Sequence, residues 1–470
     1  MSEHVGEDAQ ASANHHEVQG LDSGHLTRNQ IVGLALASYI PAVGLASVPV
    51  LLLGTAGNGS WLGALIAAVA TALVGVAIIT FARRFVVTGS LYSYIAYAFG
   101  PWARALMGAG LLLGYIAQVG AIAFLVGLFG GSFLLSIGVS SGLDVGVQMV
   151  IYTISVLIAA TIAYRGLDTS VRVAIGLAVI SVPLMLLITV AVALKTGVDL
   201  SSQLSVEGAT SSGIFQGVAA GAAFLVGFES CAALAAETRD PKRSVPIAVM
   251  SIPVVLGITY VLATLLQVPG LTAAGDALAA GTSPAAALAG EAGLGTNVAK
   301  ATDLVLAVAT FAALIGFVNF GSRFVATLAA DGLLPRWSAR THPRFQSPSN
   351  AIVLISVLGL GAILLLVALN TDDIFSVYYS VATIIVYFWV VPYLLICAGA
   401  IKLLLGERRL TPVVCVSAAV GAAAMGWLYV NGIVNPPAAP VDAMSWVALI
   451  AVAALFVVFL ALGVRARNRR

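Results

Sequence analysis

Charged residues are scarce in this chain, and their scarcity decides the class of protein. Asp, Glu, Lys and Arg make up 9% of the 470 residues, whereas apolar residues make up 60% and the mean hydropathy is +1.04. Soluble domains carry about 25% charged residues. The composition therefore predicts an integral membrane protein in a lipid bilayer, and the formal net charge of +2 gives no indication of nucleic-acid binding.

Histidine and cysteine are also rare, and their positions exclude several kinds of site. The five histidines lie outside the long apolar stretches, so an intramembrane Ser–His pair or a histidine metal site is not expected. The three cysteines lie within apolar stretches, which argues against a disulfide framework. The sequence lacks a glycine-rich phosphate loop ending in Lys-Ser or Lys-Thr, which argues against ATP-driven transport. We therefore expect no enzymatic activity, no cofactor and no bound metal.

Long apolar stretches, in contrast, are abundant. A helix needs about 20 apolar residues to span a bilayer, and about twelve stretches of the sequence reach that length. We therefore predict an all-α integral membrane protein with about twelve transmembrane helices. Their approximate limits are 30–54, 61–82, 101–135, 144–164, 170–194, 213–236, 244–269, 298–328, 349–368, 374–401, 411–432 and 444–464.

The basic residues predict how these helices are oriented. If the chain starts in the cytoplasm, 20 of the 22 Lys and Arg residues lie on the cytoplasmic side, and only Lys195 and Lys300 lie outside. Cytoplasmic loops of membrane proteins carry such an excess of positive charge. Both termini are therefore expected in the cytoplasm, in a multi-pass protein of the cell (cytoplasmic) membrane. The polar residues 1–26 resemble a disordered tail and not a signal peptide.

Two of the apolar stretches are interrupted near their midpoints. The first, 30–54, is broken at Ile40-Pro41-Ala42-Val43-Gly44, and the second, 213–236, is broken at Gly227-Phe228-Glu229-Ser230. Proline removes a backbone donor and glycine loosens a helix, so backbone polar groups are left free in the middle of the membrane. Paired discontinuous helices of this kind are typical of the substrate site of a secondary transporter.

The spacing of the breaks predicts an internal symmetry. They lie about 186 residues apart, which is about the length of a five-helix unit with its loops. Because the first unit starts inside and the second outside, we predict a five-plus-five inverted repeat with discontinuous helices 1 and 6. The predicted parts are the tail 1–26, a first repeat over 27–200, an inverted second repeat over 201–405, and helices 11 and 12 with a basic tail over 406–470.

The ends of the broken helices predict the chemistry of the site. The N–H groups of Val43, Gly44 and Leu45 suit a carboxylate, and carbonyl groups around 38–40 and 223–226 suit an ammonium group. Together they match the head group of an α-amino acid; the alternative is that both breaks are kinks without a ligand. For Tyr115 and Asn319, helix packing is the alternative role. The predicted substrate-binding residues are Ile40, Pro41, Ala42, Val43, Gly44, Leu45, Ala223, Phe224, Val226, Gly227, Phe228, Tyr115 and Asn319.

Glu229 is the clearest carboxylate within a predicted span. An intramembrane carboxylate is costly to bury and indicates a functional site by default. Two roles stay open for Glu229: it carries a proton that drives transport, or it accepts hydrogen bonds from free N–H groups of the broken helices. Lys300 and Asp303, in contrast, are spaced i,i+3 at the end of a span and are expected to form a surface pair.

Three ordered blocks of sequence resemble the amino acid–polyamine–organocation (APC) family of secondary transporters. They are Gly227-Phe228-Glu229-Ser230 with the following 236–246, Ser322-Arg323 through Pro335, and 88–94 with Phe99-Gly100-Pro101. The resemblance covers about residues 27 to 464. It implies the inverted-repeat fold, a substrate bound between helices 1, 3, 6, 8 and 10, and alternating access by rocking of a helix bundle.

Two positions depart from the family pattern. The first break lacks the small, glycine-rich sequence of the family, and Ser181 stands where proton-coupled relatives often have an ionisable residue. The sequence nevertheless predicts a secondary active transporter, with proton-coupled import of a neutral or apolar amino acid and Glu229 as the coupling residue. An exchanger of amino acids, amines or polyamines is the alternative, and a non-transporting membrane sensor is the less favoured one. A sodium site is not expected, because residues 311–320 contain no Ser or Thr.

Overall fold

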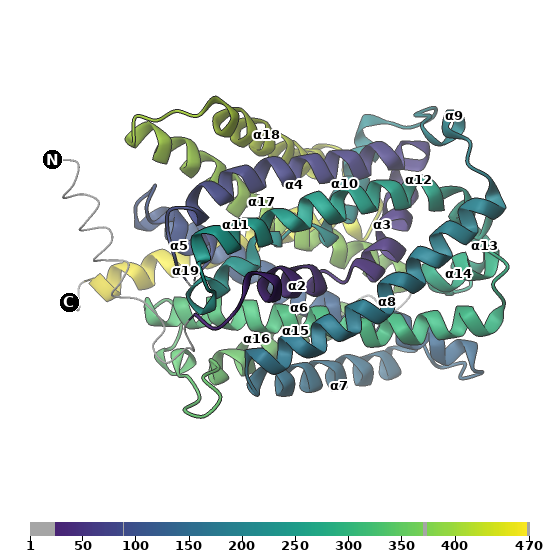
Figure 1. The fold of residues 1–470 in the computed structure, drawn as a ribbon, viewed down its shortest axis with the longest axis horizontal. Coiled ribbons are helices and arrows are strands. Elements are labelled where there is room, and N and C mark those ends of the chain that lie inside the picture. Colours follow the sequence, from purple (N-terminus) through teal and green to yellow (C-terminus); the bar gives the residue numbers. More distant parts are fainter. Residues whose placement is uncertain (1–23, 88, 370–373, 468–470) are drawn as a thin grey trace.

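The computed structural model describes residues 24–87, 89–369 and 374–467 as a bundle of helices along one long axis (Figure 1). In this part of the chain, eleven stretches are long and apolar enough to cross a membrane. The first of them, Arg28–Ala82, holds two crossings: α2 (Arg28–Ser38) and α3 (Pro41–Ala56) run one way, and α4 (Ser60–Ala82) returns after a turn at Gly57–Gly59. The described chain therefore makes the twelve crossings that the sequence predicts.

The remaining crossings follow the predicted limits closely. Crossings three, four and five are single helices, and crossing six is interrupted. Crossing seven is continuous but contains a π-helical segment at Ile252–Leu256, and the last five crossings are again single helices. In chain order they are α6 (Pro101–Ser136), α7 (Val145–Tyr164), α8 (Leu167–Thr196), α10 (Ser211–Gly221) with 3₁₀ segments at Ala222–Phe224 and Phe228–Glu237, α11 (Pro241–Ser251) with α12 (Gly257–Ala273), α15 (Thr296–Ala330), α16 (Ser349–Leu369), α17 (Ile374–Gly406), α18 (Pro412–Val434) and α19 (Met444–Arg467).

Short helices lie at the two ends of the bundle. At one end lie α5 (Leu91–Ile95) and the last turns of α19; at the other lie α9 (Leu200–Gln203), α13 (Gly275–Ala279) and α14 (Pro284–Glu291) (Figure 1). We call these the α5 end and the α14 end. The inverted relation of the two halves stays a prediction, as does the cytoplasmic side, and residues 1–23 of the predicted tail lie outside the described residues.

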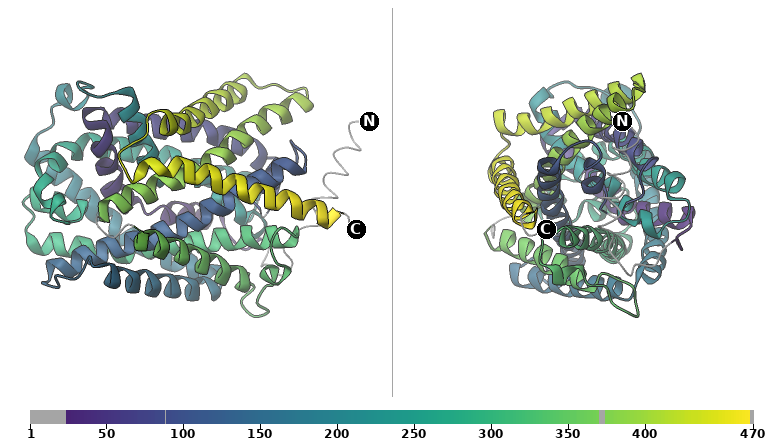
Figure 2. Two further views of the ribbon diagram at one scale, coloured as in Figure 1. Left: turned by 180° about the vertical axis from the view of Figure 1, so that it is seen from behind. Right: turned by 90° about the vertical axis from the view of Figure 1, so that its left-hand side faces the viewer.

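The helices α6 and α15 form the most extensive helix contact in the molecule. They are 36 and 35 residues long, about 54 Å at 1.5 Å per residue, so each extends well beyond a hydrocarbon core of about 30 Å. In contrast, α18 and α19 lie at the periphery of the bundle (Figure 2), where α18 packs against α4 and α17 and α19 packs against α6 and α17. The predicted separation of crossings 11 and 12 from the two repeats stays a prediction.

An aspartate near each end of α15 holds a short helix in place. At the α5 end, Asp331 accepts a hydrogen bond of 2.5 Å from Tyr92 of α5 and forms an ion pair with Arg104 of α6. At the α14 end, Asp303 accepts from Ser132 of α6 at 2.5 Å and from Ser283, the N-cap residue of α14. The two ends of the α6–α15 pair thus anchor α5 and α14.

The position of Asp303 corrects one prediction. Its side chain is only 1% exposed and faces α6, so it does not form the predicted surface pair with Lys300. The spacing i,i+3 brings two residues to one face of a helix and therefore predicted a pair at the surface. At Asp303, however, α6 and α14 cover this face of α15. The carboxylate is instead satisfied by two buried hydroxyl groups.

Asp303→Ala is expected to lower the free energy of unfolding by about 2 kcal/mol or more. Two buried hydroxyl groups lose their acceptor, and each buried unsatisfied group costs about 1–3 kcal/mol. Thermal unfolding in detergent, followed by tryptophan fluorescence, measures the change. Asp276→Ala, at an exposed position of α13, is the control and is expected to stay within about 0.5 kcal/mol of the parent protein. Equal melting temperatures of Asp303→Ala and Asp276→Ala would contradict the anchoring role of Asp303.

Candidate functional site

The first break is formed by three residues between α2 and α3. Tyr39 ends α2, Ile40 adopts the left-handed region at φ 39°, and Pro41 begins α3. A β-branched residue rarely adopts this conformation, so the surrounding packing has to enforce it. Proline at the first helical position needs no hydrogen-bond acceptor and has a helical φ. The predicted break is therefore present at the predicted residues.

The free donors predicted after this break are, however, already used. The N–H groups of Val43 and Gly44 donate to the carbonyl of Ile40 at 2.9 and 3.0 Å. Leu45 is the fifth residue of α3, and from the fifth residue on the N–H groups of a helix donate to carbonyl groups of the same helix. The prediction of three open donors was wrong for this conformation, because the left-handed turn at Ile40 directs its carbonyl toward the first turn of α3.

The second break lies between α10 and the segment Phe228–Glu237. Gly227 adopts the left-handed region at φ 77°, where glycine carries no steric penalty. The hydroxyl of Tyr39 donates to the carbonyl of Val226 at 3.0 Å, and the N–H of Gly227 donates to the hydroxyl of Tyr393 at 2.6 Å. Tyr39 thus connects the first break to the second, and Tyr393 connects the second break to α17.

Glu229 is fully buried one turn beyond this break. Its Oε2 accepts a hydrogen bond of 3.0 Å from the hydroxyl of Tyr393, the same group that accepts from Gly227. Its Oε1 has no hydrogen-bond partner among the described residues. The ring of Trp389 contacts the rings of Tyr115 and Tyr393, with centroids 5.4 and 6.0 Å apart. The carboxylate is therefore linked through one tyrosine to the backbone of the break.

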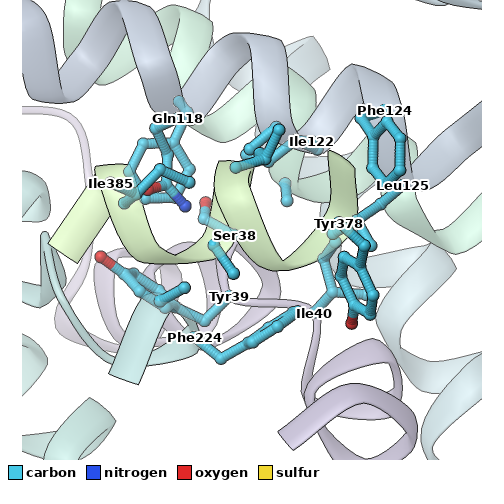
Figure 3. Close-up of a pocket in the computed structure, with 16 residues that line it drawn as sticks. Ser38, Tyr39, Ile40, Gln118, Ile122, Phe124, Leu125, Phe224, Tyr378 and Ile385 are labelled. Carbon is cyan, nitrogen blue, oxygen red and sulfur yellow. The ribbon is translucent and has the colours of Figure 1, made fainter. Parts of the chain in front are cut away.

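A small cavity lies between the two breaks (Figure 3). Its volume is about 30 Å³, which is enough for one or two water molecules but not for an amino acid. Figure 3 shows Ser38, Tyr39 and Ile40 on one side and Gln118 and Ile122 of α6 on the other. The lining residues are Ser38, Tyr39, Ile40, Gln118, Ala121, Ile122, Phe124, Leu125, Ala223, Phe224, Ala313, Phe317, Tyr378, Val381, Ala382 and Ile385, none of them charged.

The structure divides the predicted site residues into two groups. Ile40, Ala223 and Phe224 line the cavity. Asn319 instead accepts a hydrogen bond of 3.2 Å from Arg323 and lies in a separate polar network. The predicted residues outside the cavity lining are Pro41, Ala42, Val43, Gly44, Leu45, Val226, Gly227, Phe228, Glu229, Tyr115 and Asn319.

Most lining residues contributed by α6, α15 and α17 were missed by the sequence analysis. Ala121, Phe317 and Ala382 are examples: each is an apolar residue within an apolar stretch, so no local signal distinguishes it from a lipid-facing residue. For Tyr393 and Trp389 the sequence holds a weak signal of a role in the site, because a hydroxyl or an indole N–H group in an apolar stretch needs a hydrogen-bond partner when it is buried. Only the packing of α17 beside both breaks reveals their role.

The α14 end of the bundle is hollowed above the cavity. Two hollows of about 600 and 360 Å³ adjoin there, and both are lined by Gly54 and Tyr379. The hydroxyl of Tyr379 donates to the carbonyl of Val50 at 3.1 Å, so it bridges α17 and α3 between the hollows. A solute from the α14 end therefore reaches the level of Tyr379 before it meets close packing.

The sequence is similar to known proteins over most of its length. Residues 29–460 match the family described as “Amino acid permease”. An uncharacterized transporter of Mycobacterium tuberculosis is 29% identical over 393 residues, which cover 79% of this chain and 82% of the relative. The branched-chain amino acid permease BcaP of Lactococcus lactis is 25% identical over 331 residues, or 65% and 68% of the two chains. The chloroplastic cationic amino acid transporter 7 of Arabidopsis thaliana is 23% identical over 325 residues, or 66% and 54%.

Proposed function

The chain belongs to the amino acid permease family, and from this we propose that it imports a neutral amino acid with an apolar side chain by proton-coupled alternating access. The family itself identifies a multi-pass membrane transporter of amino acids and not an enzyme. One observation carries the finer proposal: a cavity without charged lining residues lies between the two broken crossings, and Glu229 is buried just after the second break. The α14 end faces outside and the α5 end faces the cytoplasm.

The lining supports an apolar substrate side chain. A basic or acidic side chain would lose its hydration in this cavity without a counter-ion among the lining residues, and such burial is costly. The relative named branched-chain amino acid permease supports the same substrate class. The relative named cationic amino acid transporter favours the other class, but no carboxylate lines this cavity to hold a cationic side chain.

The head group of the substrate competes with hydrogen bonds inside the protein. The carbonyl of Val226 is a natural acceptor for the substrate ammonium, but Tyr39 already donates to it. The carbonyl of Ile40 is likewise used by Val43 and Gly44. Because Tyr39 lines the cavity and Val226 does not, the Tyr39 hydroxyl gives up its hydrogen bond when the substrate ammonium reaches this carbonyl, and the side chains around the 30 Å³ cavity move apart to admit the substrate.

Tyr39→Phe is expected to lower the KM by about 2- to 10-fold, because the substrate no longer displaces a hydrogen bond worth about 0.5–1.5 kcal/mol. Initial rates of uptake into proteoliposomes measure the KM. Tyr429→Phe is the matched control, since Tyr429 also donates to a backbone carbonyl but lies between α18 and α19. A KM that is unchanged or raised in Tyr39→Phe would remove Val226 as the ammonium ligand.

Protonation of Glu229 acts on the second break through Tyr393. The ionised carboxylate accepts from the Tyr393 hydroxyl, whose oxygen then accepts from Gly227. The protonated carboxyl group becomes a donor and competes with the Gly227 N–H for that oxygen. A proton on Glu229 therefore changes the hydrogen bonding of the backbone beside the substrate, which is a direct way to couple the two.

Uptake by purified protein in liposomes tests this proposal. Labelled neutral, aromatic, basic and acidic amino acids, and putrescine, are offered outside with and without an inward proton gradient. Accumulation of apolar amino acids only with the gradient is the expected result. Counterflow that is indifferent to pH would identify an exchanger instead. Saturable binding without any uptake would identify a membrane sensor.

A further inference from the structure

A groove runs along the outer surface of the bundle between α7 and α8, next to the turn that joins them. Its volume is about 310 Å³, and its lining residues are Leu157, Ile158, Thr161, Ile162, Arg165 and Thr169. Leu157 is 60% exposed and Ile158 is 45% exposed, so no helix of the described chain covers this face of α7. The groove therefore faces the lipid of the bilayer, with apolar side chains along its length and an arginine at its end.

The groove extends over most of one leaflet. Leu157 precedes Arg165 by eight residues, which is about 12 Å at 1.5 Å per residue, and half of a hydrocarbon core is about 15 Å. Trp337, in the loop after α15, and Trp102, at the start of α6, are 46% and 48% exposed at the same end of the bundle. Tryptophan is enriched at the membrane–water interface. Arg165 therefore lies at the level of the lipid headgroups, and Leu157 lies at the level of the acyl chains.

A second arginine lies beside the turn between α7 and α8. The loop after α15 is fixed there, because Ser347 donates to the carbonyl of Tyr164 at 2.8 Å and the rings of Phe345 and Tyr164 have centroids 5.9 Å apart. The guanidinium of Arg344 lies over the Phe345 ring, 5.6 Å from its centroid. Among the residues that the structure describes, the guanidinium groups of Arg165 and Arg344 have no hydrogen-bond or ion-pair partner. Each of the two segments that meet at this turn thus carries an unpaired positive charge.

The charge of this region favours an anion. The segments 164–172 and 336–347 carry five arginines and one acidic residue, Asp168. An excess of basic residues that only orients the protein in the membrane requires no groove. Here, however, an unpaired arginine is itself a lining residue of an apolar groove.

These features together match a phospholipid with a net negative headgroup. A phosphate group accepts hydrogen bonds from guanidinium groups in a fork geometry, and an acyl chain covers exposed apolar side chains. A zwitterionic headgroup carries an ammonium group as well, which the two arginines repel. The groove therefore suits an anionic phospholipid better than a zwitterionic one.

We propose that the groove between α7 and α8 binds one anionic phospholipid of the leaflet at the α5 end. The phosphate group contacts Arg165 and Arg344, and one acyl chain lies along Leu157 and Ile158. The bound lipid holds the turn between α7 and α8 to the loop 336–347. Helix α8 also contacts α2 and α3, which flank the first break, so one helix connects the lipid to the substrate cavity. Binding of the lipid does not depend on which solute is transported.

Native mass spectrometry of the delipidated protein in detergent tests the site. Phosphatidylglycerol, phosphatidylcholine and sn-glycerol 3-phosphate are titrated separately. One molecule of phosphatidylglycerol is expected to bind at least about fivefold more tightly than phosphatidylcholine. Glycerol phosphate, which has the anion without the acyl chains, is expected not to bind. Equal affinities for the two lipids, or binding of glycerol phosphate as tight as that of phosphatidylglycerol, would overturn the proposal.

Variants at the headgroup end locate the phosphate. Arg165→Gln is expected to weaken phosphatidylglycerol binding about fivefold, and Arg165→Gln with Arg344→Gln at least about tenfold. Arg409→Gln, which removes an exposed arginine from the turn between α17 and α18 at the same end, is the control for net charge and is expected to bind like the parent protein. Parent affinity in the double variant, or equal weakening by Arg409→Gln, would show a general attraction to the basic surface and overturn the site.

A variant at the other end of the groove locates the acyl chain. Ile158→Trp fills the groove and is expected to weaken binding at least about tenfold while both arginines stay in place. Val179→Trp, at a 65% exposed position of α8 outside the groove, is the matched control and is expected to bind like the parent protein. Both positions are exposed, so both variants are expected to fold. Parent affinity in Ile158→Trp would overturn the proposal.

Discussion

Glu229→Gln is expected to abolish accumulation driven by a proton gradient while leaving exchange measurable. An inward gradient of one pH unit, about 1.4 kcal/mol per proton, supports about tenfold accumulation when one proton moves with each substrate. Glutamine keeps the size of the side chain and its contact with Tyr393 but cannot bind and release a proton. The accumulation ratio is therefore expected to fall to about 1, measured with a labelled apolar amino acid in proteoliposomes.

Two further variants distinguish coupling from a structural role. Glu207→Gln, at an exposed position of the loop before α10, is the control and is expected to accumulate substrate like the parent protein. Tyr393→Phe keeps the carboxylate but removes its link to Gly227, so accumulation is expected to be reduced while exchange persists. Full accumulation in Glu229→Gln would show that Glu229 is structural and that another group carries the proton.

Gly316→Ala is expected to reduce uptake of the substrate at least about tenfold. Gly316 lies where α15 crosses the end of α2, and an added methyl group would lie only 2.6 Å from the Cβ of Ser38 and still closer to its hydroxyl oxygen. Overpacking of this kind costs about 1–3 kcal/mol and shifts the backbone. Because Ser38 lines the cavity, the shift displaces the first break itself. Binding of a labelled apolar amino acid and its uptake are the measurements.

A rescue variant and a control accompany this prediction. Ser38→Gly removes both atoms that an added methyl group meets most closely, so the combination with Gly316→Ala is expected to recover part of the uptake. Gly361→Ala of α16, where no atom lies within 4 Å of the added methyl group, is expected to behave like the parent protein. Normal uptake by Gly316→Ala would mean that α2 and α15 can separate without disturbing the site.

The positions of both breaks were predictable because their causes are local. Proline at Pro41 and glycine at Gly227 act on the backbone of their own residues, wherever the chain lies in space. The number of crossings was predictable for a similar reason, since hydropathy over about 20 residues decides whether a helix enters a bilayer. Glu229 could be selected because a carboxylate in an apolar stretch is conspicuous in any sequence.

The partners of these residues were not predictable. Tyr393 is 164 residues from Glu229 along the chain, and only the packing of α17 against the second break brings its hydroxyl to the carboxylate. Val43 and Gly44 were expected to offer free donors, but the turn at Ile40 supplies their acceptor. Asp303 was expected at the surface, although α6 and α14 cover it. In each case the outcome depends on which face of a helix another helix covers.

The sequence by itself thus determined a twelve-crossing membrane protein with two interrupted helices, because hydropathy, proline and glycine act within one segment of chain. Only the tertiary structure decided which side chains meet at the cavity, which backbone groups stay free, and that the loop 336–347 brings Arg344 to the turn between α7 and α8. The physical reason is that nearly every face of these helices is apolar. An apolar pattern specifies burial in the membrane, but it does not specify the neighbour.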